Sequence, residues 1–309
     1  MAKRGAKKTQ KKKRVRWWIP VLIVLGVFII LSLPFCAVES IPDGNIAVIE
    51  IEGPIFGSGG TSYLGSSSVS SESVVKFIYQ AEENPRIEAI LFIINSPGGS
   101  AVASDEIADA VKLTNKPTVA MIREVGASGG YWVASATDHV IANRMSITGS
   151  IGVISSYLEF SDMMDKYGVS YQRLVAGDKK DLGVPFQKLS HQNEAILQTK
   201  LDKIHDYFID AIAENRQMAR EDIVKVATGE FYLGIEAKEL GLIDELGGAD
   251  TVEDYLKTEQ GIEEFEYVFY EESVSLFDVF AGVMSNFGFN VGEGIGSKLL
   301  SFNQGFLMI

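Results

Sequence analysis

The sequence predicts an α/β fold in which buried parallel strands alternate with helices. The first observation is the uninterrupted apolar run at 87–94, which is typical of a strand buried on both faces of a parallel sheet. The second is a shorter apolar run at 117–122. The third is that each run ends at a glycine-bearing turn and is followed by a helical pattern, which favours crossover connections. Hydrophobic residues make up 46% of the 309-residue chain, enough for a substantial core.

Further elements follow from local pattern. Residues 46–52 are rich in β-branched side chains and predict a strand, whereas Leu197, Leu201, Ile204 and Phe208 recur at helical spacing and predict a long helix with one buried face. Residues 57–73 are rich in Gly and Ser, so we expect a mobile loop there. In chain order, we expect strands at 46–52, 87–94, 117–122, 140–143 and 152–155, and helices at 73–84, 102–113 and 190–218.

The amino terminus has the pattern of a membrane anchor. Residues 1–16 are a basic arm, and residues 17–38 form a stretch of 22 residues without a charge. As a helix, such a stretch reaches about 33 Å, enough to cross a hydrocarbon core of about 30 Å. The positive-inside rule predicts a single-pass protein of the cell membrane with its amino terminus cytoplasmic, the rest extracytoplasmic, and the arm near anionic lipid. The alternatives are a cleaved signal peptide and lipidation of Cys36.

Composition excludes several classes of function. A single cysteine excludes an intrachain disulfide and a cysteine-based metal cluster, and three histidines leave little scope for a His-rich metal site. Residues 1–36 hold nine of the 28 basic residues and none of the 41 acidic ones, so the remainder is strongly acidic. We therefore expect no nucleic-acid partner and no metal or other cofactor.

Two glycine turns are the places where chemistry is expected. The segments 95–99 and 126–130 each follow a strand, and Gly98, Gly99 and Gly129 could present backbone N–H groups to an oxyanion. Ser128 lies in a Gly-x-Ser-x-Gly pattern, which matches a nucleophile elbow. Both segments are equally compatible with ordinary turns.

The base that would activate Ser128 is left open by the residues alone. A Ser-His-Asp esterase of the α/β-hydrolase type needs an acid and then a histidine downstream, for which Asp178 or Asp181 with His191 or His205 has the required order. A neutral lysine is the other option, because burial disfavours the charged ammonium. Spacing does not choose among the downstream lysines, which are Lys166, Lys179, Lys180 and Lys188.

Five stretches together resemble the signal peptide peptidase SppA family, in its short form with one catalytic unit. They are 93–99 (IINSPGG), 126–132 (GASGGYW), 148–153 (TGSIGV), 177–182 (GDKKDL) and 241–248 (GLIDELGG), and the resemblance spans roughly 46–255. It implies a ClpP/crotonase-like fold of repeated ββα units. It also implies a ring-like homo-oligomer that cleaves remnant signal peptides or other hydrophobic peptides, with subunits sharing a site. A non-catalytic membrane protein with the crotonase fold is the remaining alternative.

The resemblance also implies roles for single residues. Ser128 matches the nucleophile, Lys180 the general base with Lys179 as the second choice, and Ser150 a serine that orients the lysine amine. The backbone N–H groups of Gly98 or Gly99 and of Gly129 match the oxyanion hole. Related Clp proteases use a histidine about two dozen residues after the serine, and residues 145–155 contain none, which favours lysine.

The expected organisation therefore has four parts. We expect a cytoplasmic arm at 1–16, a transmembrane anchor at 17–38 and a peptidase domain at 39–260. Residues 261–309 form a tail with an amphipathic pattern, expected to contact another subunit, with a membrane-surface element as the alternative.

Overall fold

A computed structural model describes residues 44–58 and 68–272 of the chain. The expected arm and anchor, the middle of the expected loop at 57–73, and the amphipathic part of the tail lie outside these residues. Within the described part, no helix combines the length and apolar character needed to cross a membrane.

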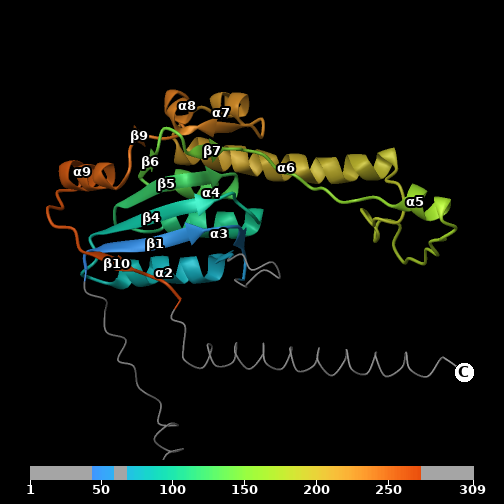
Figure 1. Cartoon of the computed structure of the whole chain (residues 1–309), viewed down its shortest axis with the longest axis horizontal. Helices are drawn as coiled ribbons and strands as arrows, with labels where there is room; N and C mark the ends of the chain where they lie inside the picture. Colours follow the sequence, from blue (N-terminus) through green and yellow to red (C-terminus); the bar gives the residue numbers. More distant parts are fainter. Residues whose placement is uncertain (1–43, 59–67, 273–309) are drawn as a thin grey trace, which may run out of the picture. The chain divides into compact units, whose positions relative to one another are not determined.

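A mainly parallel sheet forms the centre of the described part (Figure 1). Its main path runs in the order β10-β1-β4-β5-β6-β9, and every pair along this path is parallel. These strands are β1 (Ile46–Glu52), β4 (Ala89–Ser96), β5 (Thr118–Ala127), β6 (His139–Ala142), β9 (Glu245–Leu246) and β10 (Tyr267–Phe269). This architecture confirms the predicted α/β class.

Short strands lie beside this path, near the end of β5. Strand β7 (Ile147–Gly149) pairs with β5 in parallel and with β8 (Phe231–Leu233) antiparallel. Strands β2 (Ile55–Phe56) and β3 (Val69–Ser70) form a separate parallel pair. The pairing of β7 with β8 brings segments more than eighty residues apart in the sequence into contact.

Helices cover both faces of the sheet because the strands alternate their side chains. Within β1, Ala47, Ile49 and Ile51 belong to a core shared with α2 (Ser71–Glu83), α3 (Ala101–Lys112) and α4 (Gly129–Ser135). Ile46 and Val48 belong to a second core, which is closed by α9 (Ala249–Glu259). Smaller helices complete this part, namely α7 (Arg220–Val226) and α8 (Gly234–Glu239).

The long helix α6 (His191–Asn215) is buried only in its carboxyl-terminal half, where it packs on α4. Phe208 stacks on Trp132 of α4 with ring centroids 4.5 Å apart, and Ile209 and Ile212 are buried beside it. The structure describes every residue from 152 to 207, and none of them is buried. We call residues 152–207 the exposed arm. Helix α5 (Ser161–Lys166) lies in the exposed arm, at the end of α6 away from the sheet (Figure 1).

Two sequence-based expectations are wrong. Residues 152–155 form no strand; the strand is β7, three residues long, and it ends where Gly149 and Ser150 take consecutive positive φ angles of 74° and 51°. Two left-handed residues in succession break an extended chain. The described end of the expected loop is also ordered, because Val69 and Ser70 form β3 and α2 starts at Ser71. The Ser70 hydroxyl caps that helix by accepting the Ser73 N–H at 3.3 Å.

Candidate active site

Ser128 occupies a sharp turn between a strand and a helix. Strand β5 ends at Ala127, α4 starts at Gly129, and Ser128 between them has φ 53° and ψ −122°. A non-glycine residue in this region costs on the order of 1–3 kcal/mol, and such strain is concentrated at functional sites. Its N–H donates to the Gly149 carbonyl at 2.8 Å, and its carbonyl accepts from Trp132 N–H at 2.9 Å. The backbone is thus fixed on both sides, while the half-buried hydroxyl has no hydrogen bond among the described residues.

The turn at Gly98 and Gly99 is packed directly against Ser128. A Cβ added at Gly98 would lie 2.5 Å from the Gly129 nitrogen and 2.9 Å from the Ser128 Cβ, and Gly98 has φ +93°. A Cβ added at Gly99 would lie 2.1 Å from the Ile55 carbonyl oxygen. Only glycine fits at either position, because a side chain at Gly98 would push this turn away from Ser128 and one at Gly99 would push it away from Ile55.

Two backbone donors in this region are free. The Gly98 N–H donates to the Ser96 hydroxyl at 3.1 Å, so the structure already gives this donor a partner. Within the described residues, neither Gly99 N–H nor Gly129 N–H has a hydrogen-bond acceptor. Gly129 is the first residue of α4, where the N–H groups have no partner inside the helix and favour a negative charge. This arrangement can hold an oxyanion formed next to Ser128.

Ser150 lies on the other side of the nucleophile turn. The carbonyl of Gly149 accepts the Ser128 N–H, and the N–H of Ser150 donates to the Glu230 carbonyl at 2.8 Å. The peptide unit between Gly149 and Ser150 therefore links the nucleophile turn to the segment at 229–230. The Ser150 hydroxyl donates to the Gly229 carbonyl at 3.4 Å.

Within a single chain, the structure does not bring the two preferred lysines to Ser128. Lys179 and Lys180 are exposed in the arm between β7 and α6, and the Lys179 Nζ donates to the Asn193 Oδ1 at 2.7 Å. Among the described residues, no contact links either amine to Ser128. Lys188 is also occupied, because it pairs with Asp162 at 2.7 Å, and this hydrogen bond raises the pKa of its amine.

The histidines and acids of the esterase alternative are likewise in other contacts. His191 is fully exposed and lies 3.6 Å from Glu194. The His205 Nε2 lies 3.2 Å from the Ile151 carbonyl oxygen, next to Ser150 rather than Ser128. Asp181 pairs with Arg173 at 2.6 Å, and the hydrogen bond from Arg173 holds the pKa of the Asp181 carboxyl below its ordinary value. The Asp178 carbonyl accepts from the same arginine.

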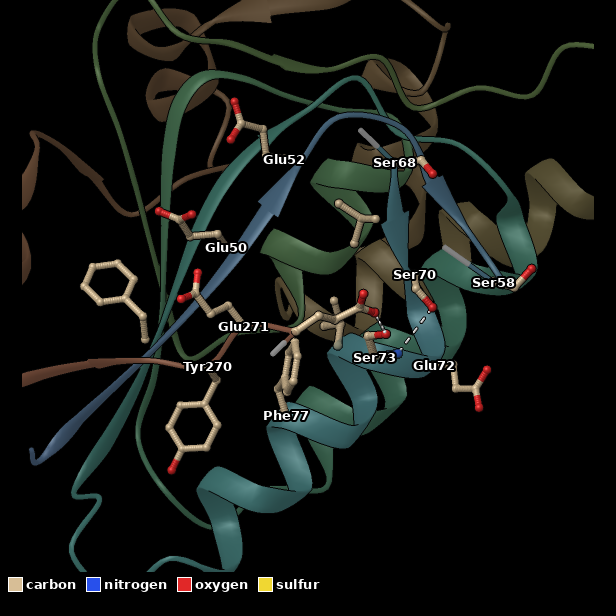
Figure 2. Close-up of a pocket in the computed structure, with 14 residues that line it drawn as sticks. Glu50, Glu52, Ser58, Ser68, Ser70, Glu72, Ser73, Phe77, Tyr270 and Glu271 are labelled. Atoms are coloured by element: carbon tan, nitrogen blue, oxygen red, sulfur yellow. Dashed lines mark hydrogen bonds between the residues drawn. The ribbon is translucent and has the colours of Figure 1, made fainter. Parts of the chain in front are cut away.

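A separate acidic cavity of about 650 Å³ lies where α2 begins, beside β1 and the chain after β10 (Figure 2). In it the Ser73 hydroxyl donates to the Glu272 carboxylate. Ser128 does not line this cavity, which is bordered by the glutamates Glu50, Glu52, Glu72, Glu271 and Glu272. Within residues 44–58 and 68–272, no group of three or more His, Cys, Asp or Glu side chains is arranged to hold a metal ion.

Sequence reasoning missed the contacts that support Ser150. The chain at 229–230 contacts Ser150 through backbone carbonyls rather than side chains, and Gly229 there has φ +84°. The order of residues in the sequence allows His205 in a triad, whereas in the structure its ring contacts the Ile151 carbonyl oxygen. Neither contact is visible in the sequence, because both join segments more than fifty residues apart.

The chain is similar to a family of peptidases and to several proteins named as proteases. The model of peptidase family S49 matches residues 110–263. The chain is 30% identical over 234 residues to "Putative protease MJ0651" of Methanocaldococcus jannaschii, which covers 74% of each chain. It is 27% identical over 242 residues to "Putative signal peptide peptidase SppA" of Enterococcus faecium, covering 77% of this chain and 70% of that protein. It is 29% identical over 249 residues to "Serine protease SPPA, chloroplastic" of Arabidopsis thaliana, covering 78% and 37%.

Proposed function

Because the chain belongs to peptidase family S49, the family of signal peptide peptidase SppA, and is a serine peptidase, we propose that it is a membrane-anchored endopeptidase with a Ser–Lys dyad and a ClpP/crotonase-like fold. Ser128 is the nucleophile and Lys180 is the general base. Its substrates are remnant signal peptides or other hydrophobic peptides.

The observation that carries this proposal is the geometry around Ser128. Its hydroxyl stands at a strained strand-to-helix turn, and the free N–H groups of Gly99 and Gly129 lie at the same place. A peptide carbonyl attacked there would place its developing negative charge against these two donors. Loss of one such donor typically costs about 100- to 1000-fold in rate.

The chemistry is acyl transfer. The neutral amine of Lys180 takes the proton of the Ser128 hydroxyl while the oxygen attacks the substrate carbonyl carbon, and the carbonyl oxygen becomes the oxyanion. The lysine ammonium then gives its proton to the leaving amine as the peptide C–N bond breaks. Water, deprotonated by the same lysine, hydrolyses the resulting ester on Ser128 and releases the second product.

The exposed arm supports a homo-oligomer in which subunits share each site. Lys180 lies in the arm at 152–207, which a single chain leaves without one buried residue. Large apolar side chains of this arm face solvent, including Leu174 at 98% and Ile154 at 90% exposure. Exposed apolar surface is typical of an interaction site, and we propose that a neighbouring subunit covers this arm and brings its own Ser128 toward Lys180.

The membrane anchor rests on the sequence. An uncharged stretch at 17–38, preceded by a basic arm, places the peptidase on the extracytoplasmic side of the cell membrane, close to hydrophobic peptides left in the bilayer.

Substitution of the dyad tests the proposal. We expect Ser128→Ala and Lys180→Ala each to lower kcat for a hydrophobic reporter peptide at least about 1000-fold, because each removes a group that takes part in bond making. Both variants should keep the melting temperature of the parent protein. A fluorophosphonate should label Ser128 in the parent and not in Ser128→Ala.

Two matched variants separate the alternatives. Lys179→Ala removes the neighbouring amine and should leave most of the activity, whereas a loss confined to Lys179→Ala would move the base by one residue. Full activity of Lys180→Ala, with a loss in His191→Ala or His205→Ala, would replace the dyad with a histidine mechanism.

A further inference from the structure

Residues 228–232 form a short segment that runs beside β7 and Ser150, near the nucleophile turn; we call this segment the strap. It leads from α7 into β8 and lies antiparallel to β7, with Tyr232 opposite Thr148 and Phe231 opposite Gly149. The strap therefore borders Ser150 on the side away from Ser128.

The strap fixes the backbone of Ser150 in an unfavourable conformation. Ser150 has a backbone φ of 51°, a region that residues other than glycine rarely adopt. Its N–H donates to Glu230 at 2.8 Å, and the next carbonyl, that of Ile151, accepts the Gly229 N–H at 3.1 Å. The same Ile151 carbonyl lies 3.2 Å from the His205 Nε2. Ser150 is thus held by a contact on the peptide unit before it and by two contacts on the carbonyl of the residue after it.

The strap also provides the partner of the Ser150 hydroxyl. The Ser150 Oγ lies 3.4 Å from the Gly229 carbonyl oxygen, and a carbonyl can only accept. A hydroxyl has one proton and two lone pairs, so a proton directed at Gly229 leaves the oxygen lone pairs available as acceptors.

A lysine base needs such an acceptor. A neutral amine has one lone pair and two N–H bonds, and the lone pair must face the Ser128 hydroxyl to take its proton. An acceptor for one of the N–H bonds fixes the rotation of the amine and thus the direction of the lone pair.

We propose that Gly229 is a positioning residue, whose carbonyl orients the Ser150 hydroxyl as an acceptor for the lysine amine and so aims the amine lone pair at Ser128. The inference rests on the proposed function, in which Lys180 is the base and Ser150 orients it. The link from Ser128 to Gly149 is held separately, by the pairing of β5 with β7.

Gly229→Ala tests this role with a matched control. Gly229 has φ +84° and no atom within 4 Å of an added Cβ, so alanine there adds backbone strain without a clash. Gly261 has φ +71° and is equally open, so Gly261→Ala adds the same kind of strain far from Ser128. We expect both variants to lose similar amounts of melting temperature. Only Gly229→Ala should lower kcat, by about tenfold, with KM unchanged.

Combination with Ser150→Ala decides whether the effect passes through the hydroxyl. We expect Ser150→Ala alone to lower kcat about 10- to 100-fold, because the amine loses its acceptor. Adding Gly229→Ala to Ser150→Ala should then change kcat by less than about twofold, since the group it orients is gone. A role limited to general strain would instead multiply the two losses, and this result would overturn the inference.

A second variant displaces Gly229 without changing that residue. It keeps the inference testable if Gly229→Ala folds poorly. A Cβ added at Gly152 would lie 2.9 Å from the Gly229 Cα, so Gly152→Ala displaces the strap. It should lower kcat in the parent and have no further effect in Ser150→Ala. Parent-level kcat in Ser150→Ala would overturn the inference but leave the roles of Ser128 and Lys180 standing. Parent-level kcat in Lys180→Ala would overturn both.

Discussion

Gly129 and Ser104 meet where α4 begins, and their contact sets how closely α3 approaches the nucleophile turn. Ser104 is fully buried, and its hydroxyl donates to the Ser100 carbonyl at 3.0 Å. A Cβ added at Gly129 would lie 2.2 Å from the Ser104 Oγ, and the next nearest atom is the Ser104 Cβ at 3.2 Å. The hydroxyl of one buried residue therefore requires glycine after the nucleophile.

This contact predicts a rescue. Gly129→Ala should lower the free energy of unfolding by about 1–3 kcal/mol and also lower kcat, because the turn must move to relieve the overlap. Adding Ser104→Ala removes the clashing oxygen and should restore part of both, although Ser104→Ala alone costs about 1 kcal/mol for its lost hydrogen bond. Urea unfolding and peptide cleavage are the measurements. A double variant no better than Gly129→Ala would show that another contact is limiting.

At the residue scale, the sequence predicts that the two glycine turns form the site around Ser128. It does not predict which backbone N–H groups there are free and which already have an acceptor. The Gly-x-Ser-x-Gly pattern singles out Ser128, and the structure gives it the strained turn that the pattern implies. Gly98 and Gly99 are equivalent in the sequence. The structure separates them, because the Ser96 hydroxyl takes the Gly98 N–H and leaves that of Gly99 free. Such a division depends on the bend of the chain after β4, which no local pattern encodes.

Between elements, a buried ion pair ties the end of α6 to the sheet. Arg216 follows the last turn of α6, and its side chain is only 8% exposed. It makes two hydrogen bonds to Asp244, at 2.6 and 2.9 Å, and others to the Gly241 carbonyl. Asp244 in turn accepts the Val140 N–H of β6 at 2.8 Å. This network anchors the one helix that carries the exposed arm.

The network predicts acid sensitivity of the fold. Burial alone would raise the pKa of the Asp244 carboxyl, but the hydrogen bond and charge of Arg216 outweigh it and hold that pKa below its ordinary value. A pKa that is lower in the folded state contributes stability above about pH 4, and this contribution is lost as the pH falls through the folded pKa. Asp244→Asn should therefore lower the melting temperature at pH 7 and flatten its decrease between about pH 4 and pH 2.

An exposed arginine provides the control for this pair. Arg220 also has two carboxylate partners, Asp206 and Asp210, but its side chain is 45% exposed. Arg220→Ala should lower the free energy of unfolding far less than Arg216→Ala, which should cost about 3 kcal/mol because it leaves the Asp244 carboxylate partly buried without a partner. Equal costs would show that burial does not decide the contribution of these pairs.

Several element boundaries were predictable where one face of the element is buried. The expected strand at 46–52 coincides with β1, and the expected helices at 102–113 and 190–218 correspond to α3 and α6. The expected strand at 117–122 is real but shorter than β5, because its polar end at Arg123 and Glu124 lacks the apolar signal. The strand expected at 152–155 lies a few residues beyond the observed β7. Pairing with β5 and β8 defines β7 more than its own composition does.

For the whole molecule, the residues alone do not predict that Ser128 and Lys180 lie on different parts of the chain; only the family resemblance implies a site shared between subunits. Motif order places Ser128, Ser150 and Lys180 in sequence but says nothing of distance in space. The structure joins Ser128 and Ser150 through paired strands and puts Lys180 on an arm that one chain does not bury. A site that is assembled between chains leaves no local trace in one sequence, because its contacts depend on the partner's position.

A shared site predicts that two inactive variants complement each other. In a ring with head-to-tail contacts, each site would take Ser128 from one subunit and Lys180 from the next. Subunits with Ser128→Ala still supply the lysine, and subunits with Lys180→Ala still supply the serine. When the two are coexpressed in equal amounts and assemble at random, about one quarter of the sites are intact, so about one quarter of the parent activity should return. Assemblies of one variant alone contain no intact site and should have no activity. The matched control is a Ser128→Ala, Lys180→Ala double variant mixed with either single variant. Because a dyad built within one chain never recovers on mixing, an inactive mixture of fully assembled subunits would place serine and lysine in the same chain.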